Sequence, residues 1–178
     1  MSNLLEHLET LTDSRHAKGK RHSQTVTLAI VLLGMLCGHV HIKAIARFAK
    51  QYQPQLALAL PLPKGKTPSI MTIQRLSLRI DVEELCEVFN RWMKSYYQSE
   101  AVAIDDKSIN STVSEAHGKH QNFASIVSFF GQNTHLVWQL GVLESQKQHE
   151  IQKVQQLLAA FTDKATFTLD ALQPQKNA

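Results

Sequence analysis

Hydrophobic residues in the first hundred positions recur at the spacing of one face of an α-helix. Ser23 is placed to cap one of these segments, and Asp81 followed by Glu84 forms a capping box for another. The stripes consist of Leu4, Leu5, Leu8 and Leu11; Val26, Ile30, Leu33 and Leu36; Ile42, Ile45, Ala46 and Ala49; Ile70, Ile73, Leu76 and Ile80; and Leu85, Val88, Phe89 and Trp92. The pattern predicts an all-helical domain over residues 1–99, in which the third helix ends before Pro54.

The periodicity changes at Ala101. The run "AVAI" reads as a short buried strand that ends at Asp105 and Asp106, and "FASIVSFF" and "HLVWQLGVL" flank "GQN" as a hairpin with Gly131 in its turn. Residues 151–161 return to helical spacing, and "ATFTLD" is a final strand. The predicted order over residues 100–178 is three strands, one helix and a fourth strand, so the fold class is α+β.

The predicted connections bring two carboxylates together. If the first three strands form an antiparallel meander, a right-handed crossover through the helix lays the last strand parallel to its neighbour. Asp105 and Asp170 would then end adjacent parallel strands. Two such carboxylates repel unless a cation lies between them, and Mg²⁺ suits oxygen ligands. Spacing alone favours the alternative that each Asp caps the turn after its strand, and it leaves the metal site open.

Charge divides the 178 residues unevenly. Residues 1–80 carry eleven Lys and Arg against three acids, whereas residues 81–178 carry eight against twelve. The basic end is the candidate polyanion-binding part, because Lys and Arg neutralise phosphates. Arg15, Lys18, Lys20 and Arg21 are candidate phosphate contacts, and Arg75 and Arg79 lie on a candidate recognition helix. The alternative is that these charges only solvate the outer faces of helices.

Other classes of protein receive little support. Cys37 and Cys86 lack metal or redox spacing and read as core thiols, and the apolar run 28–38 is too short to span a bilayer. No zinc-finger spacing, phosphate-binding glycine loop or hydrolase elbow is present in the sequence. We therefore expect a cytoplasmic protein with no membrane partner.

Specific stretches of the chain resemble one family. "AIDDKSI", "ESQKQHEIQKVQQLLAAF" and "ATFTLDALQPQKNA" are similar to the first half of the catalytic domain of H-repeat-associated (ISAs-type) insertion-sequence DDE transposases. "LLEHLETLTDSRHAKGKRHSQTVTLAIVLLGMLCGHVHIKAIARFA" and "TPSIMTIQRLSLRID" are similar to the N-terminal domain associated with them. The resemblance thus covers nearly the whole chain, in the family's order.

The resemblance implies an RNase H-like catalytic domain over residues 100–178, a partial one truncated before its C-terminal elements. It implies that Asp105 and Asp170 are the first two catalytic acids of a site for Mg²⁺ or Mn²⁺, with the third acid beyond Ala178 and metal binding correspondingly weak. Lys147 and Glu150 match a further motif of the family. Asp106 stands where the family typically has Gly, so an extra carboxylate could perturb the metal, and Asn110 replaces a common Arg.

Three functions remain open on the sequence. The first is an insertion-sequence transposase for DNA transposition, by metal-dependent phosphodiester cleavage and strand transfer, that is catalytically incomplete by itself. The second is a non-catalytic DNA-binding or regulatory remnant that self-associates or pairs with a full-length transposase. The third is a small α+β protein without a nucleic-acid role. For either of the first two we expect DNA as a partner and association with a bacterial nucleoid. We also expect an uncovered apolar sheet face bearing Trp138 or Phe129.

Overall fold

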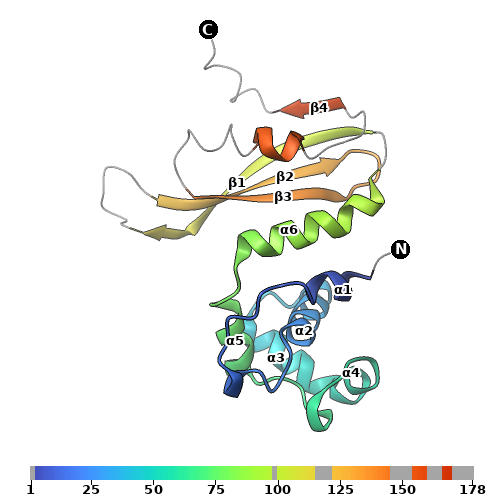
Figure 1. Ribbon diagram of the computed structural model, residues 1–178, viewed down its shortest axis with the longest axis vertical. Coiled ribbons are helices and arrows are strands. Elements are labelled where there is room, and N and C mark those ends of the chain that lie inside the picture. Colours follow the sequence, from blue (N-terminus) through green and yellow to red (C-terminus); the bar gives the residue numbers. More distant parts are fainter. Residues whose placement is uncertain (1–2, 98–99, 115–121, 145–153, 160–165, 170–178) are drawn as a thin grey trace. The chain divides into compact units, whose positions relative to one another are not determined.

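The computed structural model describes residues 3–97, 100–114, 122–144, 154–159 and 166–169. Its residues form two compact units, one over Asn3–Asp81 and one that begins at Val82. Helices make up the first unit, and the second holds a four-stranded sheet (Figure 1). The predicted α+β class is confirmed. The domain boundary predicted after residue 99 stays a prediction; in the structure the last long helix belongs to the unit that holds the sheet.

The helical unit forms where the hydrophobic stripes predict helices. Its elements are α1 (Leu4–Leu8), η1 (Ala17–Gly19), α2 (Gln24–Leu36), α3 (Ile42–Gln51), α4 (Gln53–Ala59), η2 (Pro63–Gly65) and α5 (Ile70–Ser77). Ser23 caps α2 by accepting a hydrogen bond from the Val26 amide at 3.1 Å. Helix α4 was not predicted, because Pro54 was read only as a stop. Proline is tolerated in the first turn of a helix, where its missing N–H has no partner to lose.

The core of the helical unit centres on α2 and α3. Ile30 and Ala49 are fully buried there, and Gly34 lets Ile45 approach so closely that an added Cβ would lie 3.1 Å from it. The carboxyl end of α2 departs from the prediction. Leu36 is 84% exposed and Cys37 is exposed, so neither belongs to the core of the described structure. Hydrophobic residues occur around the whole of α2, so periodicity alone could not separate its buried side from its exposed end.

The second unit begins with α6 (Val82–Met93) and η3 (Lys94–Tyr96), and its strands are β1 (Ala101–Ser114), β2 (Asn122–Gly131), β3 (Val137–Glu144) and β4 (Thr166–Leu169). The strand order is β3-β2-β1-β4. β1 pairs with β2 and β2 with β3 in antiparallel fashion, whereas β4 is parallel to β1. Residues 154–159 are helical between β3 and β4. This arrangement confirms the predicted topology and is consistent with a partial RNase H-like fold.

β1 is longer than predicted. Its pairing with β2 continues beyond Ile104 through Asp105, Asp106 and Lys107 to Ile109, so the two acids lie inside the strand rather than at its end. Aspartate is unfavourable in strands by intrinsic preference, but pairing with a neighbouring strand overrides that preference. The apolar run alone therefore located the start of the strand and not its end.

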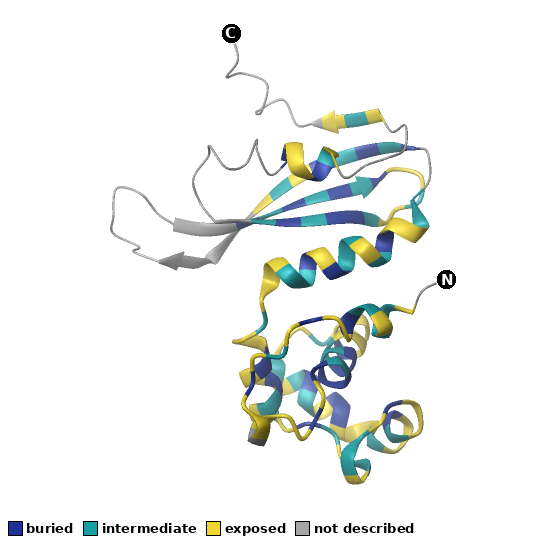
Figure 2. Cartoon of the chain, in the orientation of Figure 1, coloured by how far each residue is buried: buried dark blue, intermediate teal, exposed yellow. Residues whose placement is uncertain are grey.

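One face of the sheet forms the core of the second unit. Val102, Ile104, Val127 and Phe129 are buried there with Val154 and Leu157 from the helical residues 154–159 (Figure 2). Phe129 is fully buried and Trp138 is 1% exposed, so the expectation that these two residues form an uncovered patch is wrong. Tyr97 stacks on Trp138 with ring centroids 5.2 Å apart, and Met93 of α6 joins the same cluster.

Helix α6 also protects the free edge of β3. The Asn90 side chain donates to the Leu140 carbonyl at 2.9 Å and accepts from the Leu140 amide at 2.8 Å. Tyr97 donates its hydroxyl to the Trp138 carbonyl at 3.1 Å. These bonds satisfy backbone groups that an edge strand would otherwise offer to another chain.

We expect Asn90→Ala to lower the free energy of unfolding by about 1–3 kcal/mol, because it leaves the amide and carbonyl of Leu140 without their side-chain partner. Urea unfolding of the full chain measures this change. Glu87→Ala is the matched control, because Glu87 is exposed on the same helix and should change stability by no more than about 0.5 kcal/mol. Equal effects of the two substitutions would contradict the edge role of Asn90.

Candidate functional site

Asp105 and Asp106 lie on opposite faces of the sheet. Asp105 is paired with Ser128 and Asp106 with Val127, and successive residues of a strand alternate between the two faces. Asp105 is exposed, whereas the neighbours of Asp106 on its own face include the core residues Ile104 and Val127. The two carboxylates therefore project from opposite faces of β1, and an effect of Asp106 on a metal held by Asp105 stays a prediction.

The β1–β4 pairing ends, in the described residues, directly before both predicted metal ligands. Its last pair is Ile104 with Leu169, and Asp105 and Asp170 are the residues that follow these two in sequence. Asp170 lies outside the described residues, as do Lys147 and Glu150. Within the described part of the chain no group of three His, Cys, Asp or Glu residues is close enough to hold a metal ion. Asp105 offers an exposed carboxylate of the kind that Mg²⁺ prefers, and one carboxylate is an incomplete donor set.

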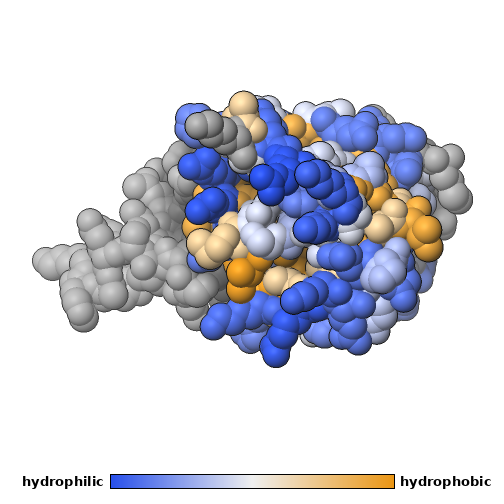
Figure 3. Space-filling view, turned by 90° about the horizontal axis from the view of Figure 1, so that it is seen from below, coloured by the Kyte–Doolittle hydropathy of each residue, from blue (hydrophilic) through white to orange (hydrophobic). Residues whose placement is uncertain are grey.

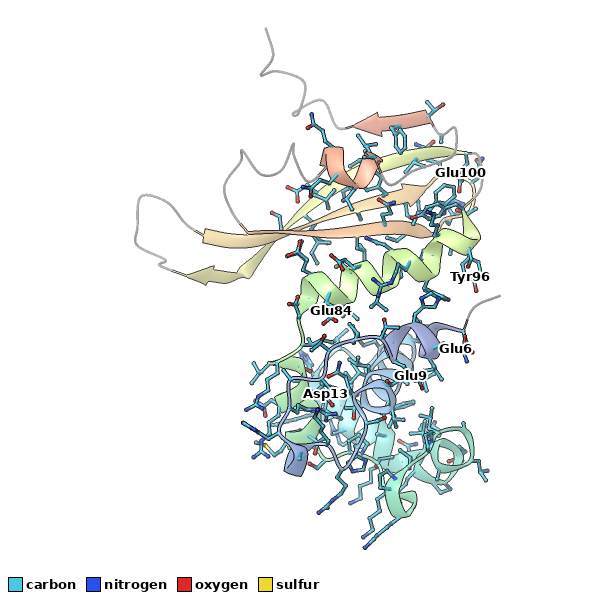
Figure 4. All side chains as sticks on the ribbon, in the orientation of Figure 1. Glu6, Glu9, Asp13, Glu84, Tyr96 and Glu100 are labelled. Carbon is cyan, nitrogen blue, oxygen red and sulfur yellow. The ribbon has the colours of Figure 1, made fainter. Side chains whose placement is uncertain are left out.

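Glu100 organises the turn between β2 and β3, a role that the sequence did not suggest. Its carboxylate accepts hydrogen bonds from the amides of Asn133 at 2.5 Å and Thr134 at 3.0 Å, and from the Thr134 hydroxyl at 2.6 Å. Figure 4 labels Glu100 at one end of the sheet. The positive φ in this connection is that of His135, at 56°, and not that of Gly131. Gly131 matters for a different reason, because a Cβ there would overlap the Glu100 carboxylate and force that side chain to shift.

Glu100 should make the stability of the chain depend on acid pH. Burial raises its pKa, but hydrogen bonds from Thr134 and Asn133 outweigh that effect and hold the pKa below its ordinary value of 4.5. The stabilisation is therefore complete above pH 4.5 and is lost as the pH falls through the lowered pKa. We expect the free energy of unfolding, followed across the acid range, to fall less steeply in Glu100→Gln than in the wild type. Parallel pH profiles for the two proteins would contradict this role.

The basic loop before α2 is built around Arg15. Its guanidinium donates from Nε to Asp13 Oδ1 at 2.8 Å and from a terminal nitrogen to Asp13 Oδ2 at 2.9 Å. It also donates to the carbonyls of Gly19 at 3.3 Å and His22 at 3.0 Å. The side-chain hydrogen bond from Arg15 is the main reason that the pKa of Asp13 lies below its ordinary value. Arg15 is only 7% exposed, and in the structure its guanidinium links residues of the loop before α2 to one another.

The other predicted phosphate contacts are placed differently. Lys20 is exposed and donates to the Asp13 carbonyl at 3.0 Å, while Arg21, Arg75 and Arg79 are exposed. Lys18 lies in η1. None of these placements tests contact with DNA, and the six residues stay predicted contacts.

A groove with a volume of about 790 Å³ brings four of these six residues together. We call it the loop groove. Its basic and histidine lining consists of Arg15, Arg21, Lys64, Lys66, Arg75, Arg79, His16 and His22. Burial lowers the pKa of His22 from its ordinary value, and the positive charges of Arg21 and Arg15 lower it further.

A second groove, with a volume of about 700 Å³, lies beside α3. We call it the α3 groove; its basic residues are Lys43, Arg47, Lys50 and Lys66. Neither Lys64 and Lys66, which stand in a connector, nor the three basic residues of α3 were singled out from the sequence. The spacing of Lys43, Arg47 and Lys50 along one face of α3 was the signal in the sequence that could have identified these three residues.

Figure 3 shows the hydrophilic surface of the helical unit, interrupted by hydrophobic patches.

We expect Arg15→Ala to lower the free energy of unfolding by about 1–3 kcal/mol, because it removes the guanidinium that donates to the Asp13 carboxylate and to two loop carbonyls. Arg15→Lys should restore only part of this loss, since an ammonium cannot reproduce the forked geometry of the guanidinium. Chemical denaturation measures both. Arg21→Ala is the control, with an expected change within about 0.5 kcal/mol, and a similarly large loss there would contradict the assignment.

Comparison with known proteins agrees with the kind of protein that these features describe. The structure combines a basic helical unit with a four-stranded sheet that is consistent with a partial RNase H-like fold. A family model described as DDE_Tnp_1-associated matches residues 5–93, which is half of the chain. The chain therefore belongs to the DDE_Tnp_1-associated family.

No curated protein and no solved structure matches this chain. Among the residues that the structure describes, no helix is long and apolar enough to cross a membrane. The family assignment thus rests on the matched residues 5–93, and what the sheet does is a separate question.

Proposed function

We propose that this chain is part of an insertion-sequence transposase. In this proposal the helical unit binds DNA, and Asp105 and Asp170 hold a divalent cation for phosphodiester chemistry. The observation that carries the metal half is the parallel pairing of β1 with β4, whose last described pair, Ile104 with Leu169, immediately precedes the two acids in sequence. The family membership of residues 5–93 supports the same class of protein.

Mg²⁺ or Mn²⁺ bound to these two acids would supply Lewis-acid activation of a phosphate oxygen and of an attacking oxygen. Asp105 contributes an exposed carboxylate that the sheet holds in a fixed register opposite Ser128. Asp106 takes no part, because it lies on the other face of β1. Two carboxylates leave most of the coordination sphere of the cation to water, so we expect weak binding and no strand transfer by this chain alone.

The subtype is also a proposal. The stretches "AIDDKSI" and "ATFTLDALQPQKNA" resemble H-repeat-associated (ISAs-type) transposases, and this resemblance supports assignment of the second unit to the first half of a DDE catalytic domain. In that role Asp105 and Asp170 are its first two acids.

A non-catalytic DNA-binding or regulatory role is the second candidate. One observation favours it: both basic grooves are formed entirely by residues within the helical unit, so binding of an anion there needs no metal site in the sheet. In this case the chain binds DNA and self-associates or pairs with a full-length transposase, in the nucleoid of a bacterial cell.

Titration of the full chain with Mn²⁺, followed by the electron paramagnetic resonance of the free ion, tests the metal half. We expect Asp105→Asn and Asp170→Asn each to weaken Mn²⁺ binding at least about tenfold, since each removes one of two charged ligands. Asp106→Asn is the matched control and should leave the affinity unchanged. Equal affinities of the wild type and Asp105→Asn, or a loss confined to Asp106→Asn, would overturn the metal assignment.

A further inference from the structure

The two basic grooves share one wall. Lys66, Thr67 and Ser69 line both the loop groove and the α3 groove, so the connector of residues 63–69 lies between them. Gln53 of α4 holds this connector by accepting hydrogen bonds from the Thr67 amide at 3.4 Å and from its hydroxyl at 3.3 Å. Lys64 and Gly65 have φ values of 55° and 64°, which gives the chain a tight left-handed turn between the two lysines.

The charges of the helical unit are segregated. Nine of the ten Lys and Arg residues between Asn3 and Asp81 whose side chains the structure describes line one groove or the other, and none of the four acids in that range lines either groove. The nine are Arg15, Arg21, Lys43, Arg47, Lys50, Lys64, Lys66, Arg75 and Arg79. Such a surface repels itself in the free protein, and a bound polyanion relieves that repulsion.

Helix α3 shows this repulsion most clearly. Lys43, Arg47 and Lys50 are exposed on one face, at intervals of four and three residues, while Ile45, Phe48 and Ala49 are buried on the opposite side. Like charges at these intervals destabilise a helix. Among residues 3–81 the described ion pairs join Arg15 and Lys20 to Asp13, and none joins these three α3 residues to an acid. A helix that only needed a solvated outer face would gain stability from acids here.

The lining of the grooves distinguishes between kinds of nucleic acid. Neither groove is lined by Phe, Tyr or Trp in the described structure, and single strands are usually held by stacking of their bases on such rings. Lysine and arginine with hydroxyl side chains such as Thr67, Ser69 and Thr72 are instead the usual partners of a duplex backbone. The two grooves together also hold far more positive charge than one small anion needs.

We propose that the connector of residues 63–69 is a phosphate-binding ridge and that one DNA duplex lies across it, with its backbone contacted in both grooves. This rests on the proposed function, which assigns DNA to the helical unit, and extends it to Lys43, Arg47, Lys50, Lys64 and Lys66. The loop groove and the α3 groove each neutralise several phosphates, and Lys66 belongs to both sets of contacts.

The test measures binding of the full chain to a random-sequence DNA duplex about three helical turns long, at salt concentrations between about 50 mM and 200 mM. Each lost phosphate contact should reduce the slope of log affinity against log salt by about 0.9. We therefore expect Lys43→Gln/Arg47→Gln/Lys50→Gln to reduce it by roughly 2.7 and Lys66→Gln by about 0.9. Lys94→Gln, an exposed lysine of η3 outside both grooves, should bind as the wild type does.

Two further variants separate the outcomes. Lys43→Arg/Lys50→Arg keeps the charge and should keep the slope of log affinity against log salt. An unchanged circular dichroism spectrum of the triple Gln variant excludes unfolding as the cause of its weaker DNA binding. Arg21→Gln/Arg75→Gln/Arg79→Gln tests the loop groove alone. If that variant loses affinity while the α3 triple variant binds normally, DNA binding stands and the two-groove ridge is wrong. No binding by the wild type would overturn both proposals.

Single-stranded DNA and duplex RNA of the same length complete the experiment. Weaker binding of both than of duplex DNA, with the α3 triple variant affected most on the duplex, supports the proposed occupant. Tighter binding of either would mean that the ridge serves another nucleic acid, and the proposal of a DNA duplex would be wrong.

Discussion

The pairing of β1 with two neighbours at once is the constraint on which the second unit depends. β2 holds β1 in an antiparallel register from Val102 to Ile109, and β4 holds its first residues in a parallel one. Because the side chains of a strand alternate, this register also decides which residues meet the core. Val102 and Ile104 turn to the buried face, and Asp105 to the opposite one. A register shift of one residue would turn Asp106 to the exposed face and Asp105 to the face that forms the core.

The supports of the sheet come from polar side chains at its margins. Asn90 pairs with the backbone of the β3 edge, and Glu100 holds the turn that joins β2 to β3. Both act on backbone groups that a hydrophobic core cannot satisfy, and an unsatisfied polar group costs more than an ordinary hydrogen bond gains. The core formed by Phe129, Trp138 and their neighbours supplies the apolar burial, and these polar contacts fix the ends and the edge of the strands around it.

In the helical unit, one ion pair stabilises the fold, whereas the clustered cations of the grooves repel one another. Asp13 and Arg15 form a mostly buried ion pair that closes the basic loop, although Arg15 also lines the loop groove. The other eight groove cations stand together without an acid in the lining. A protein that used charge only for solubility would mix the two signs over its surface. Within one unit, Arg15 thus stabilises the fold through Asp13, whereas the other groove cations are placed to bind an anionic partner. Family membership by itself makes no such distinction between individual residues.

The amino-acid sequence by itself determined the class and order of the elements. Hydrophobic periodicity located the helices of the first unit except α4, and the three strands, helix and fourth strand of the second. An antiparallel meander followed by a crossover through the helix predicted that β4 is parallel to β1. These features follow from local side-chain chemistry and from chain connectivity, and both can be inferred from the order of residues along the chain. The basic character of the first eighty residues was equally visible.

Tertiary structure decided what each polar residue does. Arg15 and Arg21 are equivalent by composition, but only the fold buries the first against Asp13 and leaves the second exposed. Only strand pairing extended β1 past its acids and sent Asp105 and Asp106 to opposite faces. Lys66 entered two grooves because α3, α5 and a connector meet there, and no periodicity along the chain encodes that meeting. The reason is the same in each case: burial and pairing depend on neighbours that are distant in sequence, so they exist only when the chain is folded.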